Sequence, residues 1–135
     1  MTNQTIRRGL LAGATALVSL AALALPGSAH HSTAMFAWGS ETRLQRMTVD
    51  RWEWTNPHTF LYAHDANGTR YAFEGMSPNH LVRYGWSRRS VQPGQVIDLT
   101  YYALRDGRNG GFNVTVTLPG GTTLNQFGER GTQAR

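Results

Sequence analysis

The sequence predicts a mainly β protein, a five-stranded OB-like barrel with one short helix between strands 3 and 4, preceded by a signal peptide. Three observations support this prediction. Five stretches of the chain alternate like strands, the first of them changes its apolar face midway, and a helix-like stretch separates the third from the fourth. The 135 residues allow one domain, and 40% hydrophobic against 16% charged residues is typical of a folded chain.

The first 29 residues are typical of a signal peptide. Residues 1–8 are polar and end in Arg7-Arg8, an apolar run covers 10–25, and Pro26-Gly27 breaks it. Small residues at positions 27 and 29 predict cleavage after Ala29, whereas the competing small-x-small site at 22–24 lies inside the apolar run. An uncleaved anchor is the alternative, although the run is short and Ala-rich for a membrane span.

Composition limits the compartment and the partners. Cleavage after residue 29 leaves 11 Arg and 8 acidic residues, a formal charge of +3, which is too mild to indicate a polyanionic partner. We expect a periplasmic protein without a membrane span, exported by the general route or, given the paired arginines, by the twin-arginine route. Export argues against nucleic acid as a partner. The absence of Cys excludes disulfides and thiolate metal sites.

The first three predicted strands cover residues 43–54, 59–65 and 70–74. In the first, Met47 and Val49 share one face while Trp52 and Trp54 share the other, which indicates a β-bulge and a bend. The other two flank Asn67-Gly68, a strong hairpin signal because both residues accept a positive φ. An open sheet with the helix laid against one end is the alternative to a closed barrel.

The predicted helix begins after Ser77, which can cap it, has Pro78 in its first turn and stops at Gly85. Strands at 96–103 and 112–118 follow, and the second of these alternates most clearly. We therefore divide the mature chain into an N-terminal arm at 30–41, the barrel at 42–120 and a polar, frayed tail at 121–135.

Several motifs occur together over nearly the whole mature chain. They are His30-His31-Ser32-Thr33-Ala34-Met35-Phe36, Trp54-Thr55-Asn56-Pro57-His58 and Glu74-Gly75-Met76-Ser77-Pro78-Asn79. In this order they resemble an uncharacterised family of small exported bacterial proteins, a domain of unknown function. The resemblance implies a periplasmic location, and it brings no established activity, so the function has to be argued from the residues. Ala37 departs from the pattern, because an acidic residue is expected after Phe36.

The mature N-terminus predicts a metal site. A free amine and imidazole at His30, with a second imidazole at His31, form a chelate that suits Cu(II), Ni(II) and Zn(II), and Cu(II) binds most tightly. Met35 adds a thioether that suits Cu(I), and His58, at a strand start near the barrel mouth, is the preferred distant ligand. His64 and His80 are further candidates.

Each of these residues also has a purely structural interpretation. His30 and His31 would then be solvated on an arm, and His58 would hydrogen-bond a backbone group of the Asn56-Pro57 turn. Met35 and Phe36 would plug the barrel.

The sequence thus predicts a periplasmic binding module that holds a transition-metal ion, copper being the best fit, through His30, His31, Met35 and His58. The alternative is a metal-free module that binds an envelope protein or glycan through its barrel face. We expect no enzyme, because the hydrolase, zinc-protease and phosphate-loop motifs are absent from the sequence. The oligomeric state is not predicted.

Overall fold

The computed structural model describes residues 33–128. The expected succession of three strands, a helix and two strands is present within them, with a short helical turn before it and a sixth strand after it. The elements are η1 (Thr33–Met35), β1 (Phe36–Glu53), β2 (Phe60–His64), β3 (Arg70–Glu74), α1 (Pro78–Leu81), η2 (Val82–Tyr84), β4 (Val96–Leu104), β5 (Gly110–Thr117) and β6 (Thr123–Asn125).

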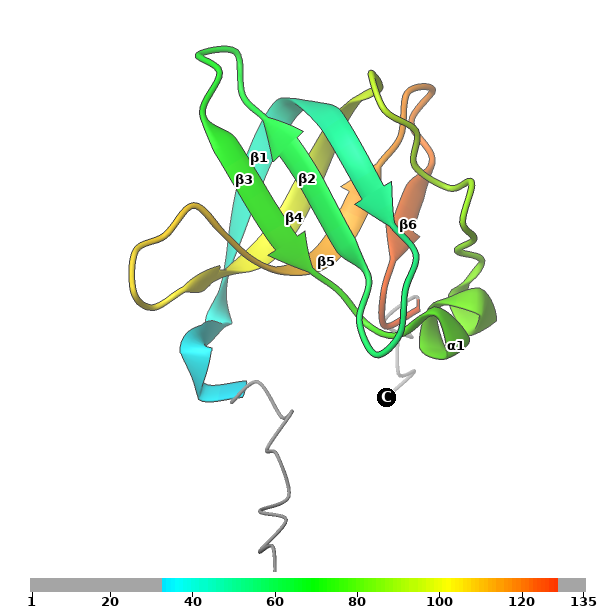
Figure 1. Cartoon of the computed structure of the whole chain (residues 1–135), viewed down its shortest axis with the longest axis horizontal. Coiled ribbons are helices and arrows are strands. Elements are labelled where there is room, and N and C mark those ends of the chain that lie inside the picture. The colour runs from blue at the N-terminus through cyan, green and yellow to red at the C-terminus, as the bar shows by residue number, and fades with distance from the viewer. Residues whose placement is uncertain (1–32, 129–135) are drawn as a thin grey trace, which may run out of the picture.

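The first five strands close into a barrel (Figure 1). β1 pairs antiparallel with both β2 and β4. β2 in turn pairs antiparallel with β3, and β4 pairs antiparallel with β5. A parallel pairing of β3 with β5 joins the two edges. This confirms the OB-like barrel with its helix between β3 and β4, and it excludes the open sheet, because closure leaves neither of these edges unpaired.

β1 bends so that it can belong to both halves of the barrel. Its first part pairs with β4 and its last part with β2, and the register shifts between Leu44 and Met47 and again between Val49 and Arg51. The second shift confirms the bulge predicted from the change of apolar face. At the first shift Arg46 has a φ of 55°, the one non-glycine residue with positive φ among residues 33–128.

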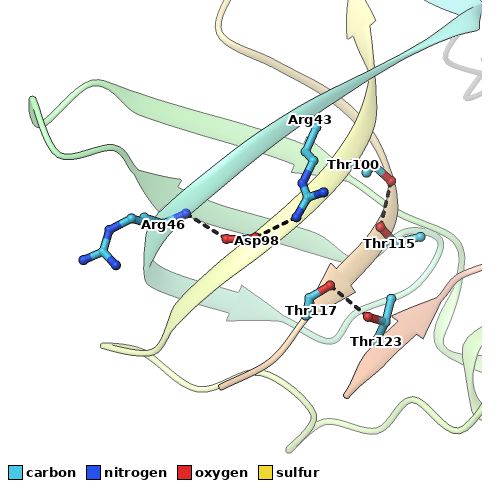
Figure 2. Close-up of polar contacts among 7 residues, drawn as sticks. All are labelled: Arg43, Arg46, Asp98, Thr100, Thr115, Thr117 and Thr123. Carbon is cyan, nitrogen blue, oxygen red and sulfur yellow. Dashed lines mark hydrogen bonds and ion pairs between the residues drawn. The ribbon is translucent and has the colours of Figure 1, made fainter. Parts of the chain in front are cut away.

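Asp98 of β4 holds this bend (Figure 2). Its Oδ1 accepts the backbone N–H of Arg46 at 2.9 Å, and its Oδ2 accepts from the Arg43 guanidinium at 3.0 Å. An N–H in the left-handed region has lost its partner in the β ladder, and the carboxylate replaces that partner. The N–H of Arg46, followed by the guanidinium of Arg43, holds the pKa of Asp98 below its usual value.

Two adjacent glycines allow β5 to pack closely between β3 and β4. A Cβ on Gly110 would lie 1.9 Å from the Ala72 carbonyl oxygen of β3, and a Cβ on Gly111 would lie 1.9 Å from the Tyr102 carbonyl oxygen of β4. No side chain fits at these distances, so glycine is required where β5 is held between its two neighbours.

Two local features predicted from short motifs are confirmed, the hairpin at Asn67-Gly68 and the helical segment from Ser77 to Gly85. In the hairpin between β2 and β3, only Gly68 has a positive φ, of 81°, and the Asp65 carboxylate accepts the N–H groups of Asn67 and Thr69 at 2.9 Å. Ser77 caps α1 by accepting the N–H of His80 at 3.3 Å, and Gly85 ends the helical segment with a φ of 82°.

The barrel interior is apolar and continues under the helical segment. Leu81 and Trp86, which lie on either side of η2, are buried in the same cluster as the strand residues. Its buried members are Met47, Val49, Leu61, Ala63, Phe73, Leu81, Trp86, Val91, Ile97, Leu99, Tyr101 and Val116. A second group lies outside the barrel wall, where the ring of Phe36 contacts those of Trp38 and Phe112 at 5.4 and 5.6 Å. Phe36 is therefore buried in this second group and does not fill the barrel interior.

Two strands of the structure extend beyond the barrel boundaries expected from the sequence. The arm ends earlier than residue 41, because β1 already begins at Phe36, whose partner in β4 is Leu104. The tail is not frayed from residue 121, because Thr123–Asn125 forms β6 on the edge of β5 and Gln126 is fully buried. A hydroxyl contact between Thr117 and Thr123 at 2.9 Å supports the pairing of β6 with β5, and Thr100 of β4 contacts Thr115 of β5 in the same way at 2.7 Å (Figure 2).

The lowered pKa of Asp98 predicts an acid-sensitive contribution to stability. The contribution is complete above about pH 5, and it is lost as the pH falls through the native pKa, because an unfolded Asp titrates near 4. Asp98→Asn should lower the free energy of unfolding by about 1 kcal/mol at pH 7. Urea titrations of both proteins from pH 7 to pH 2 should show the difference shrinking toward zero. A difference that stays constant with pH would contradict this role.

Gly111→Ala should destabilise the barrel by about 3 kcal/mol, because its Cβ meets backbone and not a flexible side chain. The matched control is Gly107→Ala, at a turn with a φ of 80° and open space around it, where the left-handed conformation alone costs about 1 kcal/mol. Thermal unfolding followed by circular dichroism compares them. Equal losses would contradict the steric requirement for glycine at position 111.

Candidate functional site

His58 lies between the Asn56-Pro57 turn, whose peptide bond is cis, and the start of β2. Its Nδ1 is 2.9 Å from the carbonyl oxygen of Gly75, which follows β3. A carbonyl oxygen only accepts hydrogen bonds, so Nδ1 carries the proton and donates it. In the neutral ring this leaves Nε2 with a lone pair. Metal-binding histidines show the same arrangement, because a backbone carbonyl or carboxylate on one nitrogen orients the other.

Glu74 stands beside this imidazole. Its Oε1 is 3.2 Å from Nδ1 of His58, and its side chain is only 11% exposed. As the last residue of β3 it is paired with Phe60 of β2 and with Phe112 of β5, so the closure of the barrel places it. The carboxylate adds negative charge beside the ring and would stabilise a metal ion on Nε2. Nothing in the sequence pointed to this pairing of His58 with Glu74.

A cleft with a volume of about 200 Å³ opens next to Glu74. Its lining is largely apolar, and its charged members are Glu74 and Arg108. Arg108 is held in the loop before β5, since its Nε donates to the Asp106 carboxylate at 2.8 Å. The residues lining the cleft are Met35, Phe36, Phe60, Ala72, Glu74, Leu104, Arg108 and Gly111.

Met35 therefore borders the same cleft as the carboxylate that contacts His58. It is half-buried at the end of η1, and its carbonyl oxygen accepts the N–H of Arg105 at 2.9 Å. The side chain of Arg105 donates in turn to the carbonyl oxygen of Phe36 at 3.0 Å. These two bonds fix the start of β1 against the loop that follows β4. Met35 and His58 are therefore linked only through Glu74, which lines the cleft and contacts the imidazole.

The other predicted ligands are placed differently. His30 and His31 lie outside the described residues. Nδ1 of His64 is 2.8 Å from the Asp50 carboxylate at the opposite end of β2, and Nε2 of His80 donates to the Gln126 carbonyl oxygen at 2.8 Å. Within residues 33–128 no three His, Asp or Glu side chains gather closely enough to hold a metal ion. A metal ion at His58 would need further ligands from the preceding segment.

A second hollow, of about 350 Å³, lies on the outer side of β2 and β3. Tyr62 is stacked with Phe60 at a ring separation of 6.3 Å, and the Arg51 guanidinium lies 4.2 Å from the centre of the Tyr62 ring. The lining residues are Asp50, Arg51, Tyr62, Arg70 and Tyr71. Aromatic and arginine side chains on this face of an OB barrel are suited to planar or sugar ligands.

The match to a known protein family covers most of the described residues. A model described as a family of unknown function (DUF6152) matches residues 16–113. The chain belongs to this family. The DUF6152 match includes Met35, His58 and Glu74, and it ends within β5, before β6 begins. Neither the comparison with curated proteins nor that with solved structures found a match. In the part of the chain that the structure describes, no helix is long and apolar enough to cross a membrane.

The hydrogen-bond partners predict opposite tautomers for two histidines. Neutral His58 should carry its proton on Nδ1, because Gly75 accepts there, whereas neutral His80 should carry it on Nε2, because Gln126 accepts there. Long-range ¹H–¹⁵N correlation spectra of the neutral protein distinguish the two forms. His80 serves as the internal control. A spectrum that places the proton of His58 on Nε2 would contradict the arrangement of the site.

Proposed function

We propose that the chain is an exported, periplasmic binding module that holds a transition-metal ion, with copper the best fit. The ligands are the mature N-terminus with His30 and His31, Nε2 of His58, and the thioether of Met35. The proposal requires the signal peptide to be removed after Ala29, because only then does a free amine stand beside the first imidazole.

One observation carries the proposal. The Nδ1–H of His58 is bound to the Gly75 carbonyl and lies next to the Glu74 carboxylate, so the ring is oriented with the lone pair of Nε2 available. A histidine that served only to tie the turn to β3 would need the carbonyl contact alone. A nearly buried carboxylate beside the same nitrogen adds negative charge next to the ring, which favours a metal ion bound at Nε2.

The donor set favours copper over other metals. Imidazole and amine nitrogens bind Cu(II) more tightly than Ni(II) or Zn(II), and a thioether stabilises Cu(I). Met35 borders the cleft, and the segment that carries His30 and His31 joins the described chain two residues before it. A ligand set of this kind accommodates both oxidation states of copper.

The test is a copper titration of the mature protein at pH 7.5, with His58→Asn as the principal variant. Asparagine can still donate to the Gly75 carbonyl but has no nitrogen lone pair in place of Nε2, so the affinity should fall between about 10-fold and 100-fold. Affinity should also fall as the pH is lowered toward 5, because protons compete for the amine and imidazole nitrogens.

The matched control is His64→Asn. His64 lies at the other end of the same strand and likewise donates Nδ1–H to an oxygen acceptor, but it does not border the cleft. It should leave the affinity unchanged. One residue added before His30 tests the amine and should weaken binding. Equal affinities for the parent protein, the His58 variant and the extended form would refute the proposal.

The stacked pair on β2 favours a second candidate, a metal-free module that binds an envelope glycan or protein. Its support is the Phe60–Tyr62 stack with Arg51 over Tyr62, which forms an amphipathic platform next to a hollow. Capture of an envelope component in the presence of a chelator, abolished by Tyr62→Ala, would support it. Capture that depends on added copper would argue for the metal site.

A further inference from the structure

Positive charge is unevenly distributed over the barrel, although the net charge of the mature chain is mild. Between Gly75 and Ile97 the sequence contains three arginines, Arg83, Arg88 and Arg89, and no acidic residue. The nearest carboxylates along the chain are those of Glu74 and Asp98, and each of these is already engaged, by His58 and by Arg43.

These three arginines differ from Arg43, Arg51 and Arg108, and they share with Arg46 and Arg70 an exposed side chain without an ion pair within residues 33–128. Arg43, Arg51 and Arg108 each form an ion pair, at 3.0, 3.1 and 2.8 Å. No side-chain partner is recorded for Arg83, Arg88 or Arg89 within residues 33–128, and all three are exposed. Guanidinium groups without a carboxylate keep their full capacity to bind phosphate oxygens in pairs.

Apolar side chains project from the same segment. Val82 is 57% exposed and Tyr84 is 39% exposed, and they lie on either side of Arg83 in η2. Leu81 and Trp86 are buried in the barrel core and anchor the turn between them. The ring of Tyr84 also contacts that of His80 at 5.0 Å, which holds the partly exposed tyrosine in place. The Nε1 of Trp86 donates to the Asn125 carbonyl at 3.1 Å, which fixes the segment against β6.

We propose that this surface, defined by Val82, Arg83, Tyr84, Arg88 and Arg89 and called here the arginine face, docks on membranes that contain anionic phospholipid. The unpaired guanidinium groups would bind lipid phosphates, while Val82 and Tyr84 would enter the headgroup layer, where tyrosine is favoured. The contact is peripheral and needs no membrane span. It is independent of the proposed metal site, which lies on other elements.

The combination of side chains favours a lipid surface over an acidic protein or a soluble polyanion. A soluble polyanion would be bound by the arginines alone and gives no account of an exposed valine and tyrosine on one helical turn. In a bilayer interface, both kinds of side chain reach their preferred surroundings within a few ångströms of depth.

The test is co-sedimentation of the mature protein with vesicles of phosphatidylglycerol and, separately, of phosphatidylcholine at 0.1 M salt. The protein should bind the anionic vesicles and not the neutral ones. Removing three interfacial charges in Arg83→Gln, Arg88→Gln and Arg89→Gln together should weaken binding on the order of a hundredfold, since each arginine contributes about fivefold. Val82→Ser with Tyr84→Ser should also weaken binding and make the remainder more sensitive to salt.

The matched control removes the same charge elsewhere, in Arg46→Gln, Arg51→Gln and Arg70→Gln together. Circular dichroism confirms that each variant is folded before binding is measured. The control should retain most of the affinity. An equal loss in both triple variants, no effect of the double serine variant, or binding to heparin without binding to vesicles would each overturn the proposal.

Discussion

The bend of β1 at Arg46 is the constraint on which the barrel depends. A straight strand could pair with β4 or with β2, but not with both along an 18-residue length while the sheet closes. The left-handed residue at the bend costs conformational energy and leaves an N–H without a partner, and the Asp98 carboxylate supplies that partner from β4. The strand that must bend and the strand that holds the bend are therefore neighbours in the sheet.

Closure in turn creates the surroundings of the candidate site. Glu74 lies between β2 and β5 only because β3 pairs with both, and all of the first five strands contribute to the lining of the cleft beside it. The segment after β6 also contacts the residues that follow β3. Gln126 accepts the N–H of Met76 at 2.6 Å, and its amide lies so close to Gly75 that a Cβ there would be 2.7 Å from it. The carbonyl that orients His58 is thus held by the segment after β6.

The proposed metal site and the proposed lipid-binding arginine face lie on two different features of this small barrel. One is a concave region where the wall is joined by β3 and β5, with a carboxylate and an imidazole at its edge. The other is the convex helical segment between β3 and β4, which covers one end of the core and leaves its cations unpaired. Neither surface lies on the hollow beside Tyr62, so the three can be tested separately.

The sequence by itself determined the strands with clear alternation, the Gly68 hairpin, the Ser77 cap and the bulge before Trp52, because each depends on neighbours a few residues apart. It singled out Met35 and His58 from residue type, but it could not connect His58 with Glu74 and Gly75, since that contact needs the register of β2 on β3. It missed β6, because Thr123–Asn125 is too short to show a period and is stabilised only by β5. It also placed the start of β1 too late, because Phe36 and Trp38 pack on the outside of the wall, where an apolar pattern does not mark the core. Contacts such as Arg46 with Asp98, 52 residues apart, were decided by the tertiary structure, because only closure of the barrel brings them together.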